Sequence, residues 1–179
     1  MQALKTFTPG NMFTLAEHQF IVLEHQEGFT LVITAESIGD RRFNGNFNSG
    51  KLNDWRNSTI RAFLNGDFLD SLGESGLDTD MITLTDWDLS DHQGGVGYGT
   101  SRDKIGLLSQ KQFEKYAEQD LLELDDWWWL ITPYAGLSYG ARLVDTDGSL
   151  GNSGAYLGSL GVRPAFRLES EILVSLIER

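Results

Sequence analysis

The chain has 179 residues, of which 40% are hydrophobic and 22% are charged, and its formal net charge is −12. This size and composition predict a single globular domain over residues 1–179. The negative charge argues against direct binding of nucleic acid, and the absence of cysteine excludes disulfides, thiolate metal sites and cysteine nucleophiles.

Residues 1–10 lack the basic segment and apolar core of a signal peptide. The longest apolar run, residues 127–131, is much shorter than the about 20 residues of a transmembrane helix. We therefore expect a cytoplasmic or virion-associated protein with no transmembrane segment and no membrane insertion. The sequence leaves its oligomeric state open.

Short apolar runs bounded by polar residues predict strands near the two ends of the chain. Residues 20–23 and 29–33 are expected to pair as a hairpin or short meander. The final segment, residues 172–177, is expected to close the sheet beside an N-terminal strand.

Residues 37–52 are rich in Asn, Gly and Arg, which predicts an irregular loop. Asn44-Gly45 is expected to form a tight turn. Phe43 and Phe47 are expected to pin the loop to the core.

The first helix is predicted at residues 58–66, because apolar residues recur there at helical spacing. Ser58 is a suitable N-cap, and Asn65-Gly66 is expected to end the helix. Arg61 is either an exposed helix charge or a buried partner for a backbone carbonyl.

A second helix is predicted at residues 109–119. Ser109 and Gln112 have the spacing of a capping box, in which each side chain satisfies a backbone N–H of the first turn. The glycine-rich stretch before it, residues 91–103, lacks the Gly-Lys-Ser/Thr ending of a phosphate-binding loop and predicts a mobile surface loop.

Three consecutive tryptophans, Trp127, Trp128 and Trp129, are predicted to lie on an extended strand. Successive side chains of a strand point to opposite faces, so Trp127 and Trp129 are expected on one face and Trp128 on the other. Either both faces are covered by the core, or one face binds a ligand. Residues 161–168 predict another strand, which Pro164 places at an edge or bulge.

Residues 134–160 combine glycines with Tyr, Asn and Arg, the residue types of adaptable recognition surfaces. Together with the loop at about residues 90–104, this stretch is expected to present a glycan or a protein ligand. The candidate binding residues are Tyr98, Tyr134, Tyr139, Arg142, Asp145, Asn152 and Tyr156.

No arrangement of residues demands catalysis, and none predicts a cofactor or a metal site. The chain has no Gly-x-Ser-x-Gly nucleophile motif and no His-Glu-x-x-His zinc motif. Residues 118–126 form an acidic patch whose spacing matches no calcium loop, which favours a solvated surface. A pocket lined by Asp125, Asp126, Asp145 or Asp147, with a raised carboxylate pKa, would favour an enzyme instead.

The sequence resembles a bacterial and phage domain family of unknown function. The family pattern has a tryptophan before a Ser-x-x-Arg-x-x-Leu-Asn helix, a Leu-Leu-Ser helix start, Trp-Trp-Leu-Arg-Ser-Pro, and Gly-Val-Arg-Pro-Ala. The chain departs from it at Ile131-Thr132, where the family has Arg-Ser. Its matches are Trp55, Ser58, Arg61, Leu64, Asn65, Leu107, Leu108, Ser109, Trp128, Trp129, Leu130, Pro133, Gly161, Val162, Arg163, Pro164 and Ala165.

This resemblance implies an α+β fold similar to the C-type lectin-like and sulfatase-modifying group. That fold has a twisted, mostly antiparallel sheet, two flanking helices and long irregular loops that bind ligands. Formylglycine-generating members use cysteines, which this chain lacks, and the calcium-dependent sugar motifs Glu-Pro-Asn and Gln-Pro-Asp are also missing.

Three functions follow as hypotheses. The first is a non-enzymatic recognition domain, phage- or prophage-related, that binds a glycan or protein through its loops. The second is an acidic inhibitor or decoy that occupies the basic surface of a nucleic-acid-binding partner, with binding that weakens as salt rises. The third is an enzyme that uses the carboxylate pocket.

Overall fold

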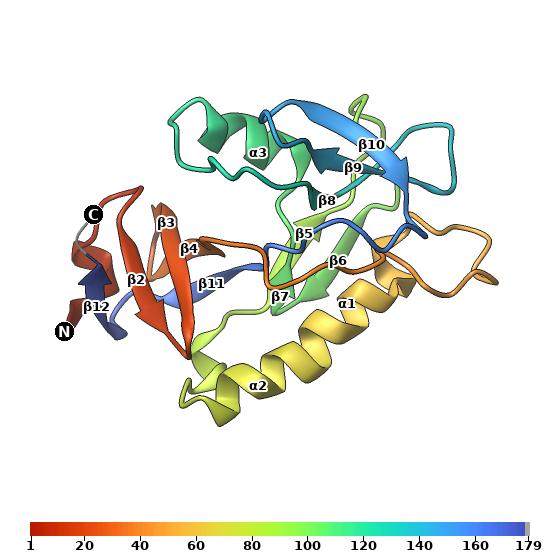
Figure 1. The fold of residues 1–179 in the computed structure, drawn as a ribbon. Coiled ribbons are helices and arrows are strands. Elements are labelled where there is room, and N and C mark those ends of the chain that lie inside the picture. The colour runs from red at the N-terminus through yellow and green to blue at the C-terminus, as the bar shows by residue number, and fades with distance from the viewer. Residues whose placement is uncertain (178–179) are drawn as a thin grey trace.

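The structure, a computed structural model, describes residues 1–177 and has an α+β fold built on antiparallel sheets (Figure 1). The largest sheet has seven strands and lies at the left of Figure 1. In spatial order its strands are β1 (Gln2–Ala3), β12 (Leu173–Ile177), β2 (Met12–Leu15), β3 (His18–Gln26), β4 (Phe29–Thr34), β11 (Ala165–Glu169) and β7 (Ile105–Gly106).

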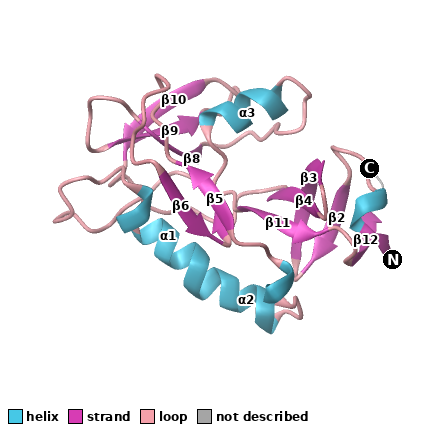
Figure 2. Ribbon diagram, turned by 180° about the vertical axis from the view of Figure 1, so that it is seen from behind, coloured by secondary structure: helices cyan, strands magenta, loops and turns pink. Residues whose placement is uncertain are grey.

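Two smaller sheets complete the fold, and the helices lie beside them. Figure 2 shows α3 (Gln110–Ala117) next to the three-stranded sheet. The continuous helix that contains α1 (Thr59–Phe63) and α2 (Leu69–Glu74) lies along the two-stranded sheet. The three-stranded sheet has the order β10 (Leu150–Gly154), β9 (Gly140–Val144), β8 (Trp128–Pro133), and the two-stranded sheet pairs β5 (Thr85–Asp88) with β6 (Thr100–Asp103). Three short 3-10 helices are η1 (Leu4–Thr6), η2 (Trp55–Asn57) and η4 (Thr79–Met81). None of the helices within residues 1–177 has the length and apolar character needed to cross a membrane.

The last strand closes the large sheet, as the sequence predicts. Strand β12 lies between β1 and β2 and pairs antiparallel with both. The predicted hairpin at residues 20–33 is β3 and β4, which turn at Gly28 with φ +80°. Residues from both ends of the chain therefore form one edge of the sheet.

The first helix is longer than the sequence predicts. α1 (Thr59–Phe63) continues through a π-helical segment, η3 (Leu64–Phe68), into α2 (Leu69–Glu74). Asn65-Gly66 does not end it, because the Asn65 side chain instead pairs with the backbone of Ile105. The helix ends at Gly76, where φ is +96° and the Leu77 N–H donates to the Leu72 carbonyl.

The second helix is confirmed. α3 (Gln110–Ala117) follows Ser109, whose side chain accepts the Gln112 N–H while the Gln112 side chain accepts the Ser109 N–H. Phe113 of this helix is buried and meets Trp128 edge to face, with ring centroids 5.7 Å apart. The helix therefore covers one face of the tryptophan strand β8.

The tryptophan strand is part of the core, and both of its faces are covered. Trp128 and Trp129 are fully buried, and Trp129 packs on Phe43 with centroids 5.8 Å apart. The Trp129 indole N–H donates to the Arg41 carbonyl, but the Trp128 indole nitrogen has no hydrogen-bond partner within residues 1–177. The prediction that Trp127 shares a face with Trp129 is wrong, since Trp127 precedes the strand and is 45% exposed.

The loop at residues 37–52 differs from two predictions. Asn44-Gly45 is not a tight turn, because the Gly45 N–H donates to the Thr59 hydroxyl and Asn44 is buried. Phe43 does pin the loop to the core, but Phe47 is 59% exposed. One phenylalanine is therefore a core residue and the other is a surface residue.

Candidate functional site

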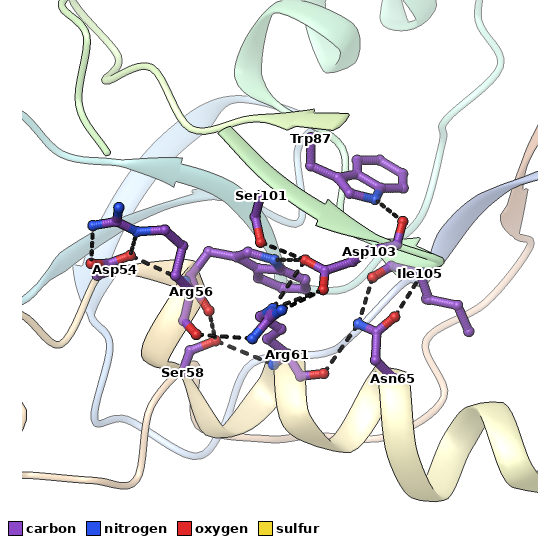
Figure 3. Close-up of polar contacts among 10 residues, drawn as sticks. Asp54, Arg56, Ser58, Arg61, Asn65, Trp87, Ser101, Asp103 and Ile105 are labelled. Carbon is purple, nitrogen blue, oxygen red and sulfur yellow. Dashed lines mark hydrogen bonds and ion pairs between the residues drawn. The ribbon is translucent and has the colours of Figure 1, made fainter. Parts of the chain in front are cut away.

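A buried carboxylate joins the motif residues around the first helix (Figure 3). Asp103, at the end of β6, accepts hydrogen bonds from the Trp55 indole nitrogen at 2.9 Å and the Ser101 hydroxyl at 2.6 Å. Arg61 donates to the same carboxylate through Nε at 2.8 Å and forms an ion pair through Nη2 at 2.7 Å. We call Trp55, Arg61, Ser101 and Asp103 the Asp103 network.

The Asp103 network keeps its carboxylate ionised. Burial raises the pKa of Asp103, but hydrogen bonds from Arg61, Ser101 and Trp55 outweigh burial and hold the pKa below its ordinary value of 3.8. Arg61 also donates to the Arg56 carbonyl, so it combines an ion pair with the backbone contact that the sequence left open. This network joins η2, α1 and β6, which makes it part of the scaffold.

A buried arginine, Arg163, joins separate segments of the scaffold beside the tryptophan strand. Arg163 is fully buried and donates to the carbonyls of Thr34, Ala35 and Leu122 at 3.1 Å each. Its guanidinium carbon lies 4.7 Å from the Trp128 ring centroid. Burial lowers the pKa of Arg163 to about 10, so it is still a cation at neutral pH.

The two loops that the sequence assigns to ligand binding meet at one cavity of about 310 Å3. Tyr98 comes from the loop between β5 and β6, and Tyr134 follows strand β8. We call this the tyrosine cavity. Its lining residues are Asn53, Asp91, Gly97, Tyr98, Pro133, Tyr134, Ala135, Gly136, Leu137 and Ser138.

Asn53 fixes the two loops relative to each other. Its buried side chain donates to the carbonyls of Leu137 at 2.7 Å and Gly140 at 2.8 Å, and accepts the Tyr98 hydroxyl at 2.6 Å. Burial and the nearby Asp54 charge raise the pKa of Tyr98, so the phenol stays a neutral donor. The position of the Tyr98 ring is therefore set by a hydrogen bond as well as by packing.

His92 positions the second tyrosine. The His92 and Tyr134 rings stack with centroids 4.1 Å apart, and the Ala135 N–H donates to His92 Nδ1 at 2.9 Å. Burial and the positive charge of Arg142 lower the pKa of His92 from its ordinary 6.5, so the imidazole is neutral at pH 7. Because Nδ1 accepts a hydrogen bond, the ring proton lies on Nε2.

The other predicted binding residues do not line this cavity. The Arg142 guanidinium carbon lies 5.9 Å from the Tyr134 ring centroid, and its Nε donates to the Gln110 side chain. Asn152 lies opposite Arg142 on β10, and Asp145 lies at the β9–β10 turn. Tyr139 and Tyr156 are exposed on separate turns. The residues that sequence analysis missed are Asn53, Asp91 and His92.

The predicted loop bounds also change. Residues 100–103 form strand β6, in which Ser101 and Asp103 are buried, so the first loop ends before residue 100. The second region, residues 134–160, contains strands β9 and β10 as well as turns.

A larger cavity, of about 680 Å3, lies between α3 and the β9–β10 turn. Its lining combines apolar side chains with acidic ones, and the acidic residues are Asp120, Glu123, Asp125 and Asp147. Hydrogen bonds from Ser149 lower the pKa of Asp147, whereas an acid catalyst needs a raised one. Within residues 1–177, no three His, Asp or Glu side chains are grouped so as to hold a metal ion.

Comparison with protein families identifies the domain. Residues 27–170 match the model of a domain of unknown function, DUF6273. The chain belongs to this family. No curated protein matched the chain, and neither did any solved structure. The DUF6273 region contains the Asp103 network, Arg163 and the tyrosine cavity, whereas β1, β2, β3 and β12 lie outside it.

Proposed function

We propose that this DUF6273 domain is a non-enzymatic recognition domain that binds a glycan in the tyrosine cavity. The observation that carries the proposal is that Tyr98 and Tyr134, from loops far apart in the sequence, line the same cavity of about 310 Å3. Tyrosine rings offer apolar faces on which sugar rings stack, and such a volume falls within the range of small-ligand sites.

Polar groups in the cavity wall suit sugar hydroxyls. The Asp91 side chain is held by N–H donors from Gln93 and Gly95, both to Oδ1. Its Oδ2 atom accepts no hydrogen bond from residues 1–177 and is available to a ligand hydroxyl. The aromatic walls and this carboxylate oxygen together provide both kinds of contact that a sugar needs.

We also infer a C-type lectin-like fold and a phage or prophage origin. The basis is the resemblance of the Trp-Trp-Leu and Gly-Val-Arg-Pro-Ala motifs to a bacterial and phage family whose fold group presents ligands on loops. The neighbouring genes test the origin. Phage structural genes beside this one would support it, and a metabolic operon would contradict it.

The glycan proposal is tested on an array and then by titration. We expect the wild-type domain to bind at least one glycan and Tyr134→Ala to weaken that binding by about tenfold or more, because the stacking surface is lost. Tyr156→Ala is the matched control, since Tyr156 is an exposed tyrosine outside the cavity. Tyr156→Ala is expected to bind as wild type does.

Three outcomes overturn the glycan proposal. The first is an array without any bound glycan, and the second is an equal loss of binding in Tyr134→Ala and Tyr156→Ala. The third is that the domain binds a protein through Tyr134 and binds no glycan. In that case the tyrosine cavity would be the binding site, but its ligand would be a protein. Circular dichroism of each variant separates a lost contact from a lost fold.

A further inference from the structure

Two adjacent arginines, Arg41 and Arg42, line a third cavity beside the loop that contains Phe43. This cavity has a volume of about 460 Å3 and is formed where the β4–η2 loop meets α1 and the segment after β10. In Figure 1 that loop, coloured orange to yellow, extends at the right beside the blue segment. Its wall includes Asp40, Arg41, Arg42, Gly45, Thr59 and Gly158.

An aromatic ring lies near each guanidinium group. The Arg41 guanidinium carbon lies 3.3 Å from the Phe63 ring centroid, and that of Arg42 lies 5.5 Å from the Phe47 centroid. Contacts of this kind hold the faces of a guanidinium and leave its N–H edges for a ligand.

The backbone at this point is also fixed. The Arg41 N–H donates to the Leu160 carbonyl at 2.9 Å, and the Arg41 carbonyl accepts the Trp129 indole N–H at 2.8 Å. The loop is therefore tied to the buried tryptophan strand, and the arginines start from a rigid base.

Neither arginine is neutralised by the protein. Within residues 1–177, the side chains of Arg41 and Arg42 form no ion pair and no hydrogen bond, whereas Arg56, Arg61 and Arg102 each pair with an aspartate. The chain has 26 acidic residues and a net charge of −12. Two unpaired arginines beside one aspartate give this cavity a formal charge of +1 in an otherwise acidic molecule.

We propose that Arg41 and Arg42 form an oxyanion site that binds a phosphate, sulfate or carboxylate group of a ligand. Paired guanidinium groups match the oxygens of such anions, and charge-assisted hydrogen bonds are the strongest that a protein surface offers. Thr59 adds a donor, because its oxygen accepts the Gly45 N–H and its own hydrogen remains free for the anion. The site is separate from the tyrosine cavity and does not depend on glycan binding there.

The test is a titration of the 15N-labelled domain with inorganic phosphate, sulfate and acetate at constant ionic strength, observed by NMR at the amides of Gly45 and Gly158. We expect saturable shifts with at least one of the three anions. The preferred anion identifies the ligand group, because phosphate and sulfate report a tetrahedral oxyanion and acetate reports a carboxylate. Arg41→Gln/Arg42→Gln is expected to weaken the binding by about tenfold or more.

Arg102→Gln is the matched control, since Arg102 is an exposed arginine already paired with Asp86. It is expected to bind the anion as wild type does. Shifts that do not saturate with any of the three anions overturn the proposal, as does undiminished binding by the double variant. If the double variant does not fold, Arg42→Gln alone decides between these outcomes, because Arg42 is exposed.

Discussion

The Asp103 network and the tyrosine cavity differ in what fixes their side chains. Asp103 is buried and receives hydrogen bonds from residues on η2, α1 and β6. Tyr98 and Tyr134 are partly exposed and come from loops. The residues that match the family pattern, including Trp55, Arg61 and Arg163, lie in the scaffold. Among the residues that line the cavity, Pro133 is the single match to that pattern.

This difference indicates that the motif residues serve the fold, whereas the proposed ligand site is built mainly from other residues. A motif residue that satisfies buried groups has to be kept for stability, whatever the domain binds. Loop residues such as Tyr98 and Asp91 can change without breaking the core. Substitutions in the two regions are therefore expected to separate stability from binding.

The largest effect on stability is expected from Arg163→Met. Removing the guanidinium leaves the buried carbonyls of Thr34, Ala35 and Leu122 without their donor. We expect a loss of about 3–5 kcal/mol in the free energy of unfolding, measured by urea denaturation. Arg102→Met, at an exposed ion pair, is the control and should cost at most about 1 kcal/mol. Equal stability of the two variants would contradict the scaffold role of Arg163.

The next effect is expected from Asp103→Asn, at about 2–3 kcal/mol, because the ion pair with the partly exposed Arg61 is lost. The folded pKa of Asp103 lies below the ordinary 3.8, so its stabilising contribution is complete above that pH. As the pH falls below 3.8, the unfolded chain takes up the proton first and the contribution is lost.

Urea denaturation of wild type and Asp103→Asn over a range of pH checks this sign. The difference in stability between them should shrink as the solution is acidified. Asp86→Asn removes an exposed carboxylate paired with Arg102 and serves as the control, with little effect at any pH. A gap that stays constant down to low pH would show that Asp103 does not contribute as a carboxylate.

The smallest of the three effects on stability is expected from Asn53→Ala. The Asn53 side chain connects the scaffold to the tyrosine cavity. Its amide holds the carbonyls of Leu137 and Gly140 and the hydroxyl of Tyr98. We expect a loss of about 1–2 kcal/mol and faster amide hydrogen exchange at residues 134–140, with exchange in α1 unchanged. Unchanged exchange at residues 134–140 would mean that Asn53 does not hold this loop.

Local signals predicted part of the fold well. Helix α3 was predictable because Ser109 and Gln112 form their capping box within one turn. The end of the first helix was not predictable, because the Asn65 side chain pairs with the backbone of Ile105, a residue 40 positions further along the chain. A sequence window around residue 65 contains Asn-Gly, a common helix end, and gives no sign of that distant partner.

The candidate site likewise depends on contacts between residues far apart in the chain, which local sequence patterns do not reveal. Composition made Tyr98 and Tyr134 candidate binding residues, because tyrosine in glycine-rich loops is typical of recognition surfaces. Their shared cavity depends on Asn53 and His92, whose contacts lie 45 and 43 positions away in the chain. Two of the three partners of Asp103, Trp55 and Arg61, precede it by more than 40 residues, so the sequence around Asp103 gave no sign of the network.

The position of β12 also bears on how the molecule assembles during synthesis. This strand lies between β1 and β2, which come from the first 15 residues. Strands β1 and β2 are therefore synthesised well over a hundred residues before β12, the strand that pairs with both of them. Until then β2 presents an unpaired edge, the kind of surface on which nascent chains associate wrongly.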